Sequence, residues 1–257
     1  MKKINITISG ALGRMGKILI KRISKNKNLK LFSLTDLKSG KTISGIKTQK
    51  NNWDAFKKTD VIIDFSRPKA SLEILNYAKK LKKRVIIGTT GFTKKQNNLI
   101  KNYSRKIAIF KSGNMSLGIN LLEYIINIIA KKIPNDYQIG IGDDHHRMKI
   151  DYPSGTALML ANAISKGKNK DLESIKGKTF LNKKGNLQKN KINFFITRKG
   201  NTIGKHSVFF NNKIENIELK HTAFSRELFA DGALNAAIWI SKKNKGLFNM
   251  QDMLNLK

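Results

Sequence analysis

The sequence of 257 residues predicts an α/β protein: a Rossmann-type doubly wound parallel sheet, plus an α+β domain whose sheet is mostly antiparallel. Three observations predict this fold class. In the first 116 residues, short apolar stretches typical of strands alternate with helical patterns. A glycine-rich loop joins the first strand to the first helix. Between residues 193 and 219, extended segments follow one another without helices between them.

The N-terminal elements come in the order that a parallel sheet requires. Residues 4–8 are mostly β-branched and predict a strand, and the next segment has apolar residues at helical spacing from Met15 to Ile23. Further strands are predicted at residues 29–35, 61–65, 84–88 and 107–110, and further helices at 70–83 and after Thr93.

The second half of the chain has a different pattern. A long apolar helix is predicted over residues 117–132, and Pro134 ends it. Next come a strand from 137, a helix over 154–166, a loop rich in Lys, Asn and Gly over 167–191, strands at 193–197, 207–210 and 214–219, and a final helix over 229–242. A second domain is therefore expected to begin at residue 117.

The formal net charge of +34 raises the possibility of a nucleic-acid partner. Only eight of the 51 basic residues are arginines, however, and the lysines are spread along the whole chain. Base readout and bidentate phosphate contacts favour arginine. We therefore expect no specific nucleic-acid partner, only weak and salt-sensitive binding to polyanions.

The absence of cysteine excludes disulfides, thiolate zinc sites and iron–sulfur clusters. No apolar run approaches the roughly 20 residues that span a bilayer. The apolar stretch that follows the first lysines is too short for a signal peptide. A cytoplasmic protein without membrane segments is expected.

The glycine-rich loop has the spacing Gly10-x-x-Gly13-x-x-Gly16. Glycine lets the backbone turn tightly and approach a pyrophosphate, which the positive helix N-terminus stabilises. Leu12 occupies the usual second-glycine position, so a turn that only packs strand on helix remains an alternative. The predicted cofactor contacts in this region are Gly10, Ala11, Leu12, Gly13, Arg14 and Met15.

Asp36 ends the second predicted strand, where a carboxylate accepts hydrogen bonds from the ribose hydroxyls of a dinucleotide. A solvated loop aspartate is the alternative. A carboxylate at this position tolerates NAD and repels the 2′-phosphate of NADP, and Lys38 could offset that repulsion. The preference between NADH and NADPH stays open.

Two further turns lie at the C-terminal ends of predicted strands, the edge of an open α/β sheet where ligands bind. Each turn alone is typical of a plain connection, but their shared position favours a nicotinamide cleft. The residues concerned are Gly88, Thr89 and Thr90 in one turn, and Ser112, Gly113, Asn114 and Met115 in the other.

Residues 143–157, DDHHRMKIDYPSGTA, gather groups that can move a proton or hold an anion. His145 and His146 lie at a junction between a strand and a helix, and Lys149 follows closely. The turn Ser154, Gly155, Thr156 begins a helix with free N–H groups, a hydroxyl cap and a positive dipole end. The segment therefore predicts an acid/base group beside a site for small carboxylates.

Metal binding is the competing interpretation of the two histidines. Adjacent residues of a strand point to opposite faces, and the sequence shows no convincing third ligand nearby. We therefore expect no metal. His206 and His221 are interpreted as structural.

The segment resembles the dihydrodipicolinate reductase family (4-hydroxy-tetrahydrodipicolinate reductases) of bacterial lysine biosynthesis, which carries H-x-x-x-K-x-D-x-P-S-G-T-A. His145, Lys149, Asp151 and residues 153–157 match every fixed position. Similar blocks occur in family order over nearly the full length, at residues 10–16, 88–92, 113–120, 197–206 and 221–233.

The resemblance implies reduction of 4-hydroxy-tetrahydrodipicolinate, through loss of water, to tetrahydrodipicolinate, with NADH and/or NADPH delivering hydride to ring C4. By similarity His145 is the general acid/base, and Lys149 is a second proton donor and electrostatic clamp. The groups that would hold the carboxylates of the cyclic substrate are His146, Lys149, Thr90, Ser154, Gly155 and Thr156.

The resemblance also implies an organisation into domains. Residues 1–116, completed by 227–257, would bind the dinucleotide, and residues 117–226 would bind substrate and form a homotetramer. Hinges near 115–117 and 225–227 would let the domains close.

Two departures from the family pattern stand out. The family has two glutamates ahead of the histidine, where this chain has Gly140 and Asp143. Asp143 can keep a carboxylate role, and Gly140 cannot. Leu37 stands where some relatives have an arginine for the NADP phosphate.

Two alternatives remain besides a nucleic-acid-binding protein. One is another Rossmann oxidoreductase of a small carbonyl or imine substrate. The other is a family fold that has lost its activity, against which the intact histidine, lysine and Ser-Gly-Thr set argues.

Overall fold

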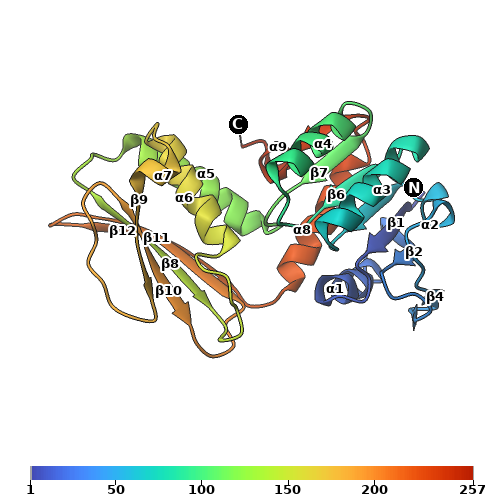
Figure 1. Cartoon of the computed structure of the whole chain (residues 1–257), viewed down its shortest axis with the longest axis horizontal. Coiled ribbons are helices and arrows are strands. Elements are labelled where there is room, and N and C mark those ends of the chain that lie inside the picture. The colour runs from blue at the N-terminus through green and yellow to red at the C-terminus, as the bar shows by residue number, and fades with distance from the viewer. Residues whose placement is uncertain (1, 257) are drawn as a thin grey trace. The chain divides into compact units, whose positions relative to one another are not determined.

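The computed structural model describes residues 2–256, and the chain divides into two compact units (Figure 1). Unit 1 comprises the chain up to Ser116 and again from Arg226, and unit 2 comprises Leu117–Ser225. The first boundary falls where the strand–helix alternation of the sequence ends. The second falls at the start of the last long helix.

Unit 1 is built on a six-stranded parallel sheet in the order β13-β7-β6-β5-β1-β2. Its strands are β1 (Ile4–Ser9), β2 (Leu29–Thr35), β5 (Val61–Asp64), β6 (Arg84–Ile87), β7 (Ala108–Lys111) and β13 (Gly246–Phe248). The direction of winding reverses between β1 and β5, which is the position where doubly wound sheets bind ligands. The predicted Rossmann-type sheet is confirmed.

Helices cover both faces of this sheet. They are α1 (Arg14–Ile23), α2 (Trp53–Lys57), α3 (Pro68–Leu81), α4 (Lys94–Ser104), α8 (Glu227–Ile240) and α9 (Met250–Leu254), and a small hairpin consists of β3 (Thr42–Ile43) and β4 (Ile46–Lys47). Alternate strand residues enter different cores: Val61 and Ile63 pack with α1 and α8, whereas Ile62 packs with α2 and α3. Burial on both faces explains why these strands are continuous apolar runs.

The C-terminal segment of unit 1 contains a strand and a helix that the sequence did not predict. The final helix does not close the chain, because β13 adds an edge strand beside β7 and α9 follows it. β13 is only three residues long, too short for an alternation signal. Aromatic packing holds it, with Trp239 of α8 in edge contact with both Phe110 and Phe248.

Unit 2 contains a five-stranded sheet in the order β12-β11-β8-β10-β9. Its elements are α5 (Leu117–Lys132), β8 (Gln138–His145), α6 (Gly155–Gly167), α7 (Leu172–Ile175), β9 (Lys176–Leu181), β10 (Ile192–Arg198), β11 (Gly204–Asn211) and β12 (Asn216–Ala223). The sheet is mixed, and the expectation of a mostly antiparallel sheet needs correction. β11 pairs antiparallel with β8 and β12, but β10 pairs parallel with β8 and β9.

The predicted loop over residues 167–191 was wrong in part, because α7 and β9 lie within it. β9 forms an edge of the sheet, where lysines and glycines that hide the strand pattern are tolerated and protect against further pairing.

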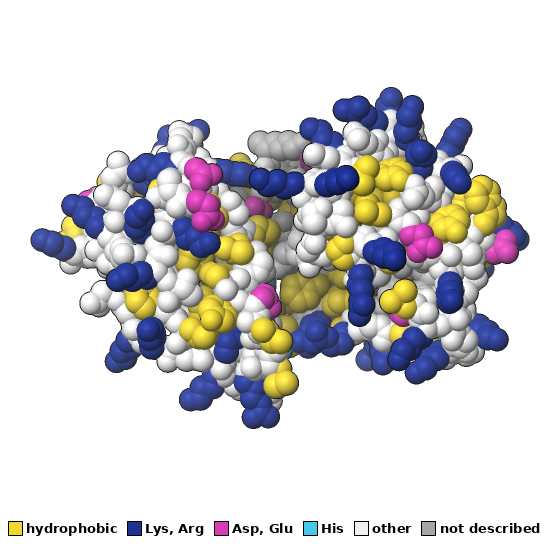
Figure 2. All heavy atoms as spheres, viewed as in Figure 1, with side chains coloured by type: hydrophobic (Ala, Val, Ile, Leu, Met, Phe, Trp, Pro, Cys, Tyr) yellow, Lys and Arg dark blue, Asp and Glu magenta, His cyan; other side chains and the backbone are white. Residues whose placement is uncertain are grey.

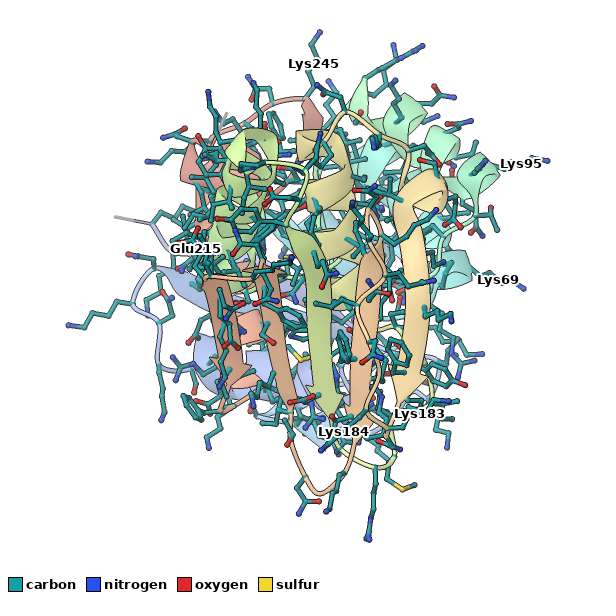
Figure 3. All side chains as sticks on the ribbon, turned by 90° about the vertical axis from the view of Figure 1, so that its left-hand side faces the viewer. Lys69, Lys95, Lys183, Lys184, Glu215 and Lys245 are labelled. Atoms are coloured by element: carbon teal, nitrogen blue, oxygen red, sulfur yellow. The ribbon has the colours of Figure 1, made fainter. Side chains whose placement is uncertain are left out.

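Helices α5 and α6 pack together on one face of the unit 2 sheet and enclose its core with Ile141, Phe194 and Val208. Figure 3 shows the opposite face toward the viewer, with no helix of unit 2 in front of the strands. We call this surface the open face of the sheet.

Figure 2 shows Lys and Arg side chains scattered over the visible surface of both units, and no single basic patch stands out there. Within residues 2–256, no helix has the length and apolar character needed to cross a bilayer.

The contact between the glycine loop and α1 yields a stability test. A Cβ on Gly16 would lie 2.3 Å from the Gly10 carbonyl oxygen and 2.7 Å from the Ala11 backbone, whereas a Cβ on Gly113 meets nothing within 4 Å. We expect Gly16→Ala to lower the free energy of unfolding of unit 1 by about 1–3 kcal/mol. Gly113→Ala should change it by less than about 0.5 kcal/mol. Both tryptophans, Trp53 and Trp239, lie in unit 1, so tryptophan fluorescence in a urea titration reports this unit. Equal stabilities of the two variants would contradict the close packing.

Candidate active site

The loop between β1 and α1 has a backbone that only glycine fits at its first position. Gly10 has φ of +77°, and a Cβ there would lie 2.4 Å from the carbonyl oxygen of Phe65. Gly13 is the N-cap of α1, no side chain caps this helix, and its first turn has no acidic residue. The positive end of α1 is thus left for an anionic group, which fits a dinucleotide pyrophosphate.

A cavity of about 560 Å³ lies at this loop, at the switch point between β1 and β5. Its lining residues are Ser9, Gly10, Leu12, Gly13, Asp36, Leu37, Lys50, Asn51, Phe65, Ser66, Arg67, Ala70 and Glu73. Asp36 accepts a 2.9 Å hydrogen bond from the backbone N–H of Leu12, so its carboxylate is held against the glycine loop. The cavity brings together four of the predicted cofactor contacts: Gly10, Leu12, Gly13 and Asp36.

The other predicted cofactor residues lie outside this cavity. Ala11 and Met115 are buried in the core of unit 1. The turns after β6 and β7 are joined by a hydrogen bond from the Ser112 N–H to the Ile87 carbonyl, and the Ser112 hydroxyl donates to the Asn114 carbonyl at 2.7 Å. The cofactor role of Arg14, Met15, Gly88, Thr89, Thr90, Ser112, Gly113, Asn114 and Met115 stays a prediction.

A buried carboxylate that sequence analysis missed organises these strand ends. Asp64, the last residue of β5, is fully buried and accepts hydrogen bonds from Ser66, Ser71 and Thr89. Burial raises the pKa of Asp64, although these donors oppose the shift. The carboxylate therefore ties the turn after β5 to the turn after β6. An aspartate that ends an apolar strand, two positions before Ser66, was the available signal.

The histidine segment of unit 2 centres on a second buried carboxylate, that of Asp143. Asp143 and His145 lie two residues apart on β8 and face the same side of the sheet. The carboxylate of Asp143 lies 3.0 Å from His145 Nδ1 and accepts hydrogen bonds of 2.9 Å from Arg198 Nη2 and 2.8 Å from the Ser154 N–H. His206 Nε2 completes the cluster, 3.3 Å from the carboxylate.

Burial and charge set the ionisation of this cluster. The donors from His145, His206, Ser154 and Arg198 together outweigh burial and hold the pKa of Asp143 well below its usual range. Burial lowers the pKa of His145, and Asp143 opposes that shift. The imidazole is therefore mostly neutral near pH 7, and its Nδ1 faces the carboxylate. This leaves Nε2 for exchange of a proton with a ligand.

Ser154 places the start of α6 beside this cluster. It is the N-cap of α6, and its hydroxyl accepts from the Ala157 N–H at 3.2 Å. A Cβ on Gly155 would meet nothing within 4 Å, so the first turn of the helix borders open space. Ser154, Gly155 and Thr156 can thus present N–H groups and a positive dipole end to a carboxylate.

The Lys149 ammonium is hydrogen-bonded to Asp151 and not to His145. It donates to both oxygens of Asp151, at 2.7 and 2.8 Å. This pairing lowers the pKa of Asp151, although burial opposes it. His146 follows the strand end, where its N–H donates to the Thr202 carbonyl at 2.7 Å. Four of the predicted substrate and catalytic residues, from His145 to Ser154, therefore lie on the segment that leads from β8 to α6.

The spatial arrangement also corrects the argument against metal binding. His206 is 61 positions from His145 in the sequence, yet it supplies a third ligand-type atom: the three ligand atoms of Asp143, His145 and His206 lie within 4.8 Å of one another. The distances of 3.0 and 3.3 Å are those of close ion-pair contacts, and neither Asp143 Oδ1 nor His145 Nδ1 has a hydrogen-bond partner among residues 2–256. We interpret the cluster as one carboxylate shared by two imidazoles. The absence of a metal stays a prediction. His206 and Arg198 are missed site residues, since only the pairing of β11 and β10 with β8 brings them to Asp143.

Comparison with known proteins gives a consistent result over the whole chain. A family model described as dihydrodipicolinate reductase, N-terminus, matches residues 4–115, and one described as dihydrodipicolinate reductase, C-terminus, matches residues 118–254. The 4-hydroxy-tetrahydrodipicolinate reductase of Pelagibacter ubique (strain HTCC1062) is 54% identical over 100% of both chains. That of Buchnera aphidicola subsp. Cinara cedri is 46% identical, over 98% of this chain and 97% of the relative.

A solved structure agrees in fold. The dipicolinate-bound dihydrodipicolinate reductase from Paenisporosarcina sp. TG-14 is similar with a TM-score of 0.79 at 22% identity, covering 98% of this chain and 99% of that chain.

The contacts of Asp143 with four other residues can be tested by mutation, with the adjacent Asp144 as the control. Asp143→Asn should destabilise unit 2 by about 3–5 kcal/mol, because it leaves the buried Arg198 guanidinium without its anion. It should also lower the pKa of His145 further, since the carboxylate raises that pKa. Asp144→Asn is the control: Asp144 is partly exposed and lies 3.5 Å from Lys205, so we expect a loss of about 0–1 kcal/mol. Circular dichroism in a urea titration measures stability, and NMR titration of the imidazole measures the pKa. Equal unfolding free energies and an equal His145 pKa in both variants would rule out Asp143 as the residue that organises this cluster.

Proposed function

The chain belongs to the dihydrodipicolinate reductase family, and on that premise we propose that it reduces 4-hydroxy-tetrahydrodipicolinate, through loss of water, to tetrahydrodipicolinate in the diaminopimelate route to lysine. The observation that carries this proposal is the buried Asp143–His145 pair beside the N-terminus of α6. It places a proton-exchanging group next to a site for carboxylates.

The substrate is a small ring with two carboxylates, and unit 2 offers groups suited to hold them. The first turn of α6, with Ser154, Gly155 and Thr156, supplies N–H donors and a positive dipole. His146 and Lys149 supply further donors. Because Asp151 already holds the Lys149 ammonium through two hydrogen bonds, a substrate carboxylate can replace that partner without loss of charge pairing.

Proton transfer is assigned to His145, with Lys149 as a second donor. Nδ1 of His145 faces the Asp143 carboxylate at 3.0 Å, so Nε2 of His145 is the nitrogen that exchanges the proton completing the reduction. Gly204 keeps space near that nitrogen, since a Cβ on this residue would lie 3.2 Å from His145 Nε2. Arg198 and Ser154 hold the Asp143 carboxylate in place, which keeps the imidazole in one tautomer and orientation.

Unit 1 is assigned to the dinucleotide, which in this family is NADH or NADPH and supplies the hydride when bound. Gly10, Leu12 and Gly13 would hold the pyrophosphate at the start of α1, and Asp36 would accept from a ribose hydroxyl. The turns containing Thr89, Thr90 and residues 112–115 would border the nicotinamide. The Asp64 network supports this assignment because it fixes one of these turns.

We propose a homotetramer that uses the open face of the unit 2 sheet. Three aromatic rings form a row on this face: Phe180 and Phe195 are 5.3 Å apart, and Phe195 and Phe209 are 5.6 Å apart. The Phe209 ring packs directly against Gly140, because a Cβ there would lie 2.1 Å from the ring. The Phe209 ring thus occupies the space beside Gly140, a position where the family pattern has a glutamate. A cytoplasmic location is proposed because a biosynthetic reductase draws on the cellular pool of NAD(P)H.

The function predicts a specific loss on mutation. His145→Gln should lower kcat for 4-hydroxy-tetrahydrodipicolinate by about 100-fold or more, because the acid that completes the reduction is lost. His221→Gln, which replaces a histidine on β12 that we interpret as structural, is the control and should stay within about threefold of the unaltered chain. The substrate is generated from pyruvate and aspartate semialdehyde in a coupled reaction, and the absorbance of NADH and NADPH is followed. No turnover by folded, dinucleotide-binding protein would contradict the proposal and favour another small carbonyl or imine substrate.

The assembly is tested on the same open face. Phe195→Lys should reduce the molar mass in solution below that of a tetramer, because a charge replaces the central ring of the aromatic row. Ile128→Lys replaces an exposed apolar residue on α5, on the other layer of unit 2, and should leave the mass unchanged. Light scattering coupled to gel filtration measures both. A tetramer that survives Phe195→Lys would exclude this face as the interface.

A further inference from the structure

The segment after the β3–β4 hairpin runs alongside the end of β2 and carries a lysine to the cofactor cavity. Thr35 pairs with Gln49 in an isolated parallel bridge. The Asp36 N–H donates to the Gln49 carbonyl at 2.9 Å, and the Gln49 N–H donates to the Leu34 carbonyl at 3.0 Å. Lys50, the residue after Gln49, therefore lies beside Asp36, which is the residue assigned to the ribose.

The charged groups that line the cavity are two carboxylates and two cations. Of the carboxylates, Asp36 is engaged by the Leu12 N–H, and Glu73 accepts from the Asn51 side-chain amide at 3.0 Å. Within residues 2–256, no side chain or backbone group pairs with the Lys50 ammonium. Lys50 is thus a solvent-exposed cation at the edge of the cavity, next to Asp36.

Position separates Lys50 from the other cations nearby. Lys38, which the sequence put forward to offset the charge of Asp36, is exposed and does not line the cavity. Arg67 lines the cavity but precedes α3, at the end of β5. In a dinucleotide site the adenosine ribose lies at the end of the second strand, which is where Lys50 is placed.

NADPH differs from NADH by a 2′-phosphate on that ribose, and Asp36 alone would repel it. An ammonium acts on a phosphate as a point charge and does not need the planar geometry of arginine. We propose that Lys50 determines the acceptance of NADPH by binding the 2′-phosphate, while Asp36 serves the ribose hydroxyl of NADH, so that this site uses both cofactors. The proposal rests on the assignment of unit 1 to the dinucleotide.

The test measures cofactor binding without substrate. The dissociation constants of NADH and NADPH are determined from cofactor fluorescence for the unaltered chain and for Lys50→Gln, Lys50→Arg and Lys38→Gln. In Lys50→Gln the ratio of the NADPH constant to the NADH constant should rise about tenfold. Lys50→Arg should keep the ratio of the unaltered chain within about threefold, since the charge is retained. Lys38→Gln should change the ratio less than about twofold, since an exposed lysine outside the cavity is screened.

The same ratio of dissociation constants is measured for Arg67→Gln and at two salt concentrations. Arg67→Gln should change the ratio less than Lys50→Gln does. Raising the salt concentration from about 0.05 M to 0.5 M should shift the ratio of the unaltered chain toward that of Lys50→Gln, because the phosphate contact is screened.

The proposal is overturned if Lys50→Gln leaves the ratio unchanged, or if Lys38→Gln or Arg67→Gln shifts it as much. An unchanged ratio with normal binding leaves the reductase function standing. Normal binding and a shifted ratio without turnover of the dicarboxylate would instead remove the reductase function and keep this inference. Unaltered protein that binds neither dinucleotide would overturn both.

Discussion

The Asp143 carboxylate holds four segments of unit 2 in one arrangement. It contacts His145 on its own strand, Arg198 on β10, His206 on β11 and the backbone of Ser154 at the start of α6. A buried carboxylate is costly unless it is paired and hydrogen-bonded, so these contacts are required together. The orientation of His145, the proposed acid/base group, and the position of the turn at Ser154, the proposed carboxylate site, therefore depend on the same ion.

Unit 1 has a corresponding group in Asp64, which is equally buried but differently partnered. Its donors are hydroxyls and one backbone N–H, whereas Asp143 has a guanidinium, two imidazoles and a backbone N–H. Burial therefore prevails at Asp64 and raises its pKa, while the donors prevail at Asp143 and lower its pKa. The Asp64 carboxylate aligns two strand ends by accepting hydrogen bonds from both of the following turns. The Asp143 carboxylate is an anion paired with the Arg198 guanidinium.

Position matters more than total charge for the chemistry of this basic chain. Most of its lysines are solvated and have only weak effects on one another, because salt screens exposed charges. The informative cations are those whose place is fixed by structure: Arg198 against a buried carboxylate, Lys149 in a two-oxygen pair with Asp151, and Lys50 beside Asp36. Position also decides the role of Gly140, because the absence of a side chain there leaves room for the Phe209 ring on the open face.

The sequence by itself determined the parallel sheet of unit 1, the glycine loop and the segment from His145 to Thr156, because each is encoded in neighbouring residues. Strand alternation and helix starts are local properties, and the segment proposed to be catalytic is continuous in the chain. Only the tertiary structure decided that His206 and Arg198 join Asp143, that β9 and β10 make the second sheet mixed, and that Lys50 stands next to Asp36. Each of these depends on pairing between distant strands or segments. The register of such pairing is set by long-range packing, and no spacing within the sequence records it.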